Sequence, residues 1–162
     1  MGVLAVSIGA LLFTGCGGGS TTTPSVDGST GKPSSVPGQQ LSQCAADYEA
    51  AANTMNAALA ELRRDTTDND LMPHSAANNT YATAIQTFNE KIIRLSCPED
   101  VNADIRTLVE AGAVMKSAAI LLGQGKMPNT AAMTEANEKI SLSVTLIRGS
   151  LGLPPQKGSI DR

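Results

Sequence analysis

Four stretches of regularly spaced apolar residues follow one another from Leu41 onward, and they restrict the fold more than any other feature of the chain. Within each stretch the apolar side chains recur at steps of three and four residues, which is the repeat of one face of an α-helix. The four sets are Leu41, Ala45, Tyr48, Ala52, Met55, Leu59 and Leu62; Tyr81, Ile85, Phe88, Ile92 and Leu95; Val101, Ile105, Leu108, Gly112, Met115, Ala119 and Leu122; and Met133, Ala136, Ile140, Val144, Ile147 and Leu151. They predict helices over about 41–64, 76–95, 98–123 and 130–153.

Residues that favour turns and helix ends separate the four stretches. Ser96-Cys97-Pro98-Glu99 has the pattern of a capping box, in which a serine side chain and a glutamate three residues later close the start of a helix. The other signals are Ser75 and Asn129 or Thr130 as N-caps, and Pro73, Gly123, Gly125, Pro128 and Pro154 as helix breakers. Four helices joined by short loops predict an all-α fold, a small up-and-down antiparallel four-helix bundle.

The last stretch also contains a signal for a different structure. ISLSVTLI at residues 140–147 alternates apolar and polar residues with the period of a β-strand. We expect a helix, because no other segment offers a strand to pair with it. A helix here has Leu142, Leu146 and Leu153 outside its main apolar face. We expect these leucines to be buried by a central position of the helix, and the alternative is an exposed surface for a partner.

The N-terminal residues have the composition of an export signal. VLAVSIGALLF at residues 3–13 matches the apolar region of a signal peptide and is too short to span a bilayer. Phe13-Thr14-Gly15-Cys16 then resembles the lipobox of bacterial lipoproteins, in which the cysteine is acylated and becomes the mature N-terminus. The resemblance implies export, lipid attachment at Cys16 and an extracytoplasmic location on the bacterial cell membrane. The alternatives are ordinary secretory cleavage and a free thiol.

The segment after Cys16 is too poor in apolar residues to fold. Gly, Ser, Thr and Pro dominate residues 17–40, so burial cannot offset the entropy lost on ordering. The predicted organisation is a signal peptide at 1–15, a lipid anchor and flexible tether at 16–40, the bundle at 41–153 and a disordered tail at 154–162.

The two remaining cysteines occur at the same end of the predicted bundle. Cys44 lies near the start of the first helix, and Cys97 lies between the second and third helices. With Cys16 acylated, the number of other cysteines is even, and an exported domain meets an oxidising environment. We expect a disulfide between Cys44 and Cys97; the alternative is two buried thiols.

No pattern in the sequence predicts a catalytic, metal or cofactor site. The single histidine, His74, lies in a loop without the ligand spacing that a metal requires. The net charge of −3 and the scattered basic residues argue against nucleic acid as a partner.

We therefore expect a non-enzymatic lipoprotein that binds a protein or another envelope component. The alternative is small-molecule or lipid binding in a cavity between the helices, suggested by the small residues Ala52, Gly112 and Ala119.

Overall fold

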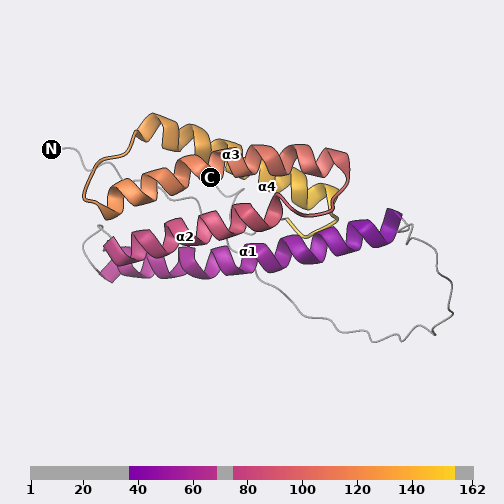
Figure 1. The fold of residues 1–162 in the computed structure, drawn as a ribbon, viewed down its shortest axis with the longest axis horizontal. Helices are drawn as coiled ribbons and strands as arrows, with labels where there is room; N and C mark the ends of the chain where they lie inside the picture. The colour runs from indigo at the N-terminus through magenta and orange to yellow at the C-terminus, as the bar shows by residue number, and fades with distance from the viewer. Residues whose placement is uncertain (1–36, 69–74, 156–162) are drawn as a thin grey trace.

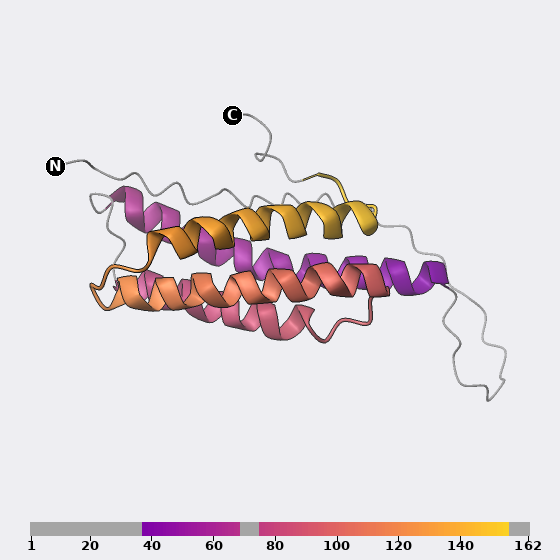
Figure 2. The same ribbon diagram turned by 90° about the horizontal axis from the view of Figure 1, so that it is seen from above.

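The computed structural model describes residues 37–68 and 75–155, which form four α-helices. The helices are α1 (Pro37–Asp68), α2 (Ser75–Ile92), α3 (Glu99–Gly123) and α4 (Thr130–Ser150). Figures 1 and 2 show them side by side along one long axis, with consecutive helices running in opposite directions. The predicted all-α antiparallel bundle is confirmed, and ISLSVTLI is helical as expected.

The first helix starts earlier than the sequence predicted. α1 begins at Pro37 rather than at Leu41, so residues 37–40 belong to the bundle and not to the tether. A proline is well tolerated in the first turn of a helix, because its missing N–H would have no partner there. The Gln40 side chain also donates a hydrogen bond from Nε2 to the backbone oxygen of Ser96, at 3.4 Å. This bond links the first turn of α1 to the connection between α2 and α3.

The predicted capping box at the start of α3 is wrong. The residue in the N-cap position is Pro98, and no side chain closes the helix start. Ser96 lies two residues too early for its hydroxyl to reach the first free N–H groups of α3. Instead, Asn102 donates a hydrogen bond from Nδ2 to the backbone oxygen of Cys97, at 2.8 Å. The connection before α3 is thus held by a side chain from inside the helix.

The last two helices end at glycines in the left-handed region. Gly125 has φ 70° and Gly152 has φ 66°, a conformation that residues with a Cβ rarely adopt. In α4 the turn is closed by the backbone N–H of Leu153, which donates to the oxygen of Arg148 at 2.8 Å. At the other end of α4, the Asn129 side chain accepts from the N–H of Ala132, so the predicted N-cap is confirmed.

The predicted apolar faces form one continuous core. Most residues of the four sets are buried, and Leu41, Ala45, Leu95 and Ile140 are partly buried and pack against them. Tyr48 of α1 and Phe88 of α2 meet edge to face, with ring centroids 6.3 Å apart. With few aromatic residues in the chain, most of the core is aliphatic.

The predicted burial of two leucines on α4 is wrong. Leu142 is 61% exposed and Leu146 is 45% exposed, whereas Leu153 is partly buried against the core. α4 is a peripheral helix and buries one face only. The side chains of Leu142 and Leu146, one turn apart, therefore form an apolar surface on the outside of the bundle.

The small residue Gly112 makes room for a polar side chain from the neighbouring helix. A Cβ atom at Gly112 would lie 2.8 Å from both amide atoms of Asn89 on α2. Asn89 in turn donates a hydrogen bond from Nδ2 to the backbone oxygen of Val109, at 3.2 Å. The space at Gly112, which suggested a ligand cavity, is filled by Asn89.

We predict that Gly112→Ala lowers the free energy of unfolding by about 1 kcal/mol, because displacing Asn89 breaks its bond to Val109. In an Asn89→Ala background the same substitution is expected to stabilise the protein, since alanine favours the helix over glycine. Urea unfolding of the four proteins in this double-mutant cycle tests the coupling. Equal effects in both backgrounds would contradict the proposed contact.

Candidate functional site

The two cysteines predicted to pair lie together at one end of the bundle. The Cα atoms of Cys44 and Cys97 are 5.3 Å apart, and their sulfur atoms are within bonding distance. Both side chains are almost completely buried. The predicted pairing is confirmed, and it joins α1 to the connection between α2 and α3. We call this the disulfide end of the bundle; it also holds the start of α1 and the end of α4.

The other predicted site residue lies outside the described residues. It is Cys16, the predicted lipid attachment site, so lipid attachment there stays a prediction. His74, for which no metal site is predicted, also lies outside the described residues. Across residues 37–68 and 75–155, no three His, Cys, Asp or Glu side chains gather closely enough to hold a metal ion. In those same two ranges, no helix has the length and apolar character needed to cross a membrane.

A buried arginine near the end of α4 is the main polar feature that the sequence did not predict. Arg148 is only 6% exposed. Its Nε atom donates a hydrogen bond to the backbone oxygen of Pro154, at 2.7 Å. Pro154 was predicted to begin the disordered tail, but this bond holds it against α4. The one available signal was a basic residue in the last turn of a helix, where backbone oxygens lack partners.

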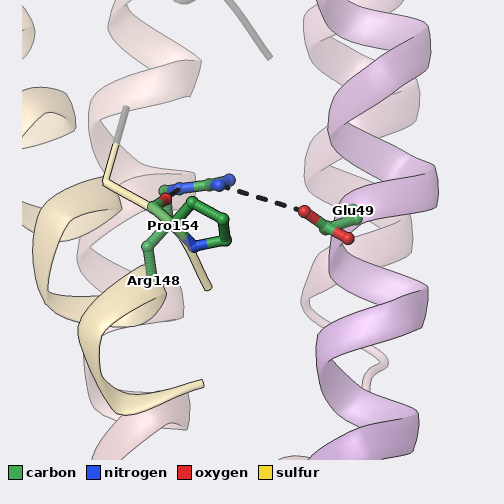
Figure 3. A network of polar contacts seen from close by, with 3 residues as sticks. All are labelled: Glu49, Arg148 and Pro154. Atoms are coloured by element: carbon green, nitrogen blue, oxygen red, sulfur yellow. Dashed lines mark hydrogen bonds and ion pairs between the residues drawn. The ribbon is translucent and has the colours of Figure 1, made fainter. Parts of the chain in front are cut away.

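Arg148 also faces α1 across the bundle. Figure 3 shows its guanidinium group pointing toward the carboxylate of Glu49, and Nη2 lies 3.9 Å from Oε1. This distance is too long for a hydrogen bond, so the attraction is electrostatic only. The Glu49 side chain is 42% exposed, and water weakens such a pair.

Two side chains of α1 also place unpartnered polar atoms in the interior. Tyr48 is fully buried, and its hydroxyl has no hydrogen-bond partner. Burial raises the pKa of the Tyr48 hydroxyl, and the positive charge of Arg148 opposes that rise in part. On the same helix, both amide atoms of Asn56 are buried without a partner. Tyr48, Glu49 and Arg148 thus form a polar group of residues on α1 and α4, and Asn56 lies about two turns further along α1.

We predict that Tyr48→Phe raises the free energy of unfolding by about 1–2 kcal/mol. The substitution keeps the ring and its contact with Phe88 but removes a buried hydroxyl that lost its bonds to water on folding. Urea unfolding of the oxidised proteins measures the change. Destabilisation by Tyr48→Phe would mean that the hydroxyl has a bonding partner in solution.

The fold and the site together define a small four-helix bundle with a buried disulfide and a polar group of residues between its first and last helices. Comparison with protein-family models, with curated proteins and with solved structures finds no match to this chain.

Proposed function

We propose that this protein is a bacterial lipoprotein whose helical bundle binds a protein or another envelope component without catalysing a reaction. The carrying observation is the position of Cys16, at the border between an apolar stretch and a Gly-rich segment. In this proposal residues 1–15 direct export, and acyl chains on Cys16 hold the protein on the extracytoplasmic side of the membrane. Two or three acyl chains suffice for stable attachment, because each buried methylene contributes about 0.8 kcal/mol.

The arrangement of the bundle is compatible with such an anchor. The segment that links Cys16 to the bundle enters it at Pro37, where α1 begins, at the disulfide end. The Cys44–Cys97 pair also suits the oxidising environment outside the cytoplasm.

The surface formed by Leu142 and Leu146 supports binding of a protein partner. Both leucines are exposed, and a salt bridge between Glu135 and Lys139, at 2.7 Å, lies one turn before them. An apolar centre bordered by charged side chains is common in protein interfaces.

Mass spectrometry of the membrane fraction tests the anchor. We expect an acylated Cys16 at the mature N-terminus, and a Cys16→Ala protein that is unacylated and still carries residues 1–15. Ser20→Ala, a substitution four residues further along the chain, is the matched control and should stay acylated and membrane-bound. An unmodified N-terminus in the wild type, or an acylated Cys16→Ala protein, would refute the lipoprotein proposal.

Photo-crosslinking in cells tests the binding surface. A crosslinking residue at Leu142 should give one discrete adduct with a protein, and the same residue at the exposed Thr83 of α2 should not. Leu146→Glu in the Leu142 variant should abolish the adduct. Identical products from both positions would reject this surface as the binding site, whatever the outcome for Cys16.

A further inference from the structure

Polar side chains lie beside the apolar core where α1 and α4 face each other. Glu49 and Asn56 are seven residues apart and therefore lie on the same side of α1, the side that faces Arg148. On α4 the partly buried Asn137 lies eleven residues before Arg148 and therefore on the same side of the helix, whereas Thr134 and Ser141 are exposed. Because the helices are antiparallel and Glu49 lies opposite Arg148, Asn56 lies at the level of Ser141. We call this contact region the α1–α4 seam.

The backbones of consecutive helices approach each other more closely than those of α1 and α4 do. The main close approaches of the backbone join α1 with α2, α2 with α3 and α3 with α4. The disulfide further ties α1 to the connection before α3. In the described part of the chain α4 is therefore attached chiefly through α3.

The closed seam leaves polar groups without the bonds that water would give them. The Tyr48 hydroxyl and both amide atoms of Asn56 are buried and have no partner. The distance of 3.9 Å between Glu49 and Arg148 exceeds a hydrogen bond. Separation of α4 from α1 would let water reach these groups, which lowers the free-energy cost of opening.

We propose that α4 detaches from the bundle and unfolds as a unit, while α1, α2 and α3 stay assembled. The open form uncovers the inner face of α4, including Val144 and Ile147, together with the Tyr48 hydroxyl. The seam is thus a conformational device of the bundle.

Native-state hydrogen exchange of the oxidised full chain tests this opening. The amide groups of α4 should exchange at least about tenfold faster than those of α2 and α3, because a detached single helix does not hold its hydrogen bonds in water. Their exchange should depend on urea less steeply than global unfolding does, because α4 alone exposes less surface. Asn56→Leu, which replaces the unpartnered amide by an apolar group of similar shape, should slow exchange in α4 about tenfold. Asn53→Leu is the matched control, because Asn53 is exposed on the same helix, and it should leave α4 unchanged.

A substitution between α2 and α3 distinguishes opening of α4 alone from unfolding of the whole bundle. Asn89→Ala weakens the α2–α3 contact, so it should accelerate exchange in α2 and α3 without affecting α4. The proposal would be overturned if all four helices of the wild-type protein exchanged at one rate, or if Asn89→Ala accelerated α4 as much as α2. The wild-type comparison decides this even if a variant fails to fold.

Discussion

Loss of the disulfide between Cys44 and Cys97 is expected to lower the free energy of unfolding by about 4 kcal/mol. The bond joins residues 53 positions apart, so it removes many conformations from the unfolded chain. A loss of this size is large beside the total stability of roughly 5–15 kcal/mol that is typical of small domains. Urea unfolding of the oxidised wild type and of a Cys44→Ala, Cys97→Ala protein measures it.

Thiol titration provides the control for this experiment. Both cysteines are buried, so the reagent is added to protein unfolded without reductant. We expect neither Cys44 nor Cys97 to react, and both to react after reduction. Reaction of both thiols before reduction, or equal stability of the wild type and the double variant, would contradict the expected contribution of the disulfide.

The sequence predicted the helices well, because the apolar period along a helix is a local property. Each of the four apolar sets predicted the position of one helix. ISLSVTLI is also helical, and no strand in the described residues could pair with it. The disulfide followed from the same reasoning, because antiparallel helices bring Cys44 and Cys97 to one end. Helix ends were predicted less well: α1 starts at Pro37, and the pattern beginning at Ser96 does not cap α3.

The sequence could not predict which residues beside the main apolar faces are covered. Leu142 and Arg148 both lie outside the apolar face of α4, yet the leucine is exposed and the arginine is buried. The difference depends on which neighbouring helix reaches each side of α4, and helix periodicity contains no such information. The same holds for Asn89, whose position over Gly112 arises from the contact between α2 and α3.

Stability is expected to fall steeply in alkaline solution because of Tyr81. Its side chain is 6% exposed, and burial raises its pKa to about 12, against a smaller opposing effect of the Arg63 charge. In the unfolded chain a tyrosine titrates near pH 10, so the unfolded state loses its proton first. The contribution of protonated Tyr81 to the free energy of unfolding is fully present below about pH 10. Between about pH 10 and pH 12 it falls by roughly 1.4 kcal/mol per pH unit, about 3 kcal/mol in all. Tyr48 should act in the same direction, because burial raises its pKa as well.

Ultraviolet absorbance of tyrosinate tests this expectation directly, because the chain contains two tyrosines and no tryptophan. Tyrosinate should appear together with the loss of the helical circular dichroism signal, since ionisation of these buried hydroxyls favours the unfolded chain. In the Tyr81→Phe protein the free energy of unfolding should depend less on pH above about pH 10, because phenylalanine has no hydroxyl proton to release on unfolding. If tyrosinate formed near pH 10 while the helices stayed intact, water would have access to Tyr81 in the folded protein, and its burial could not be a source of alkaline unfolding.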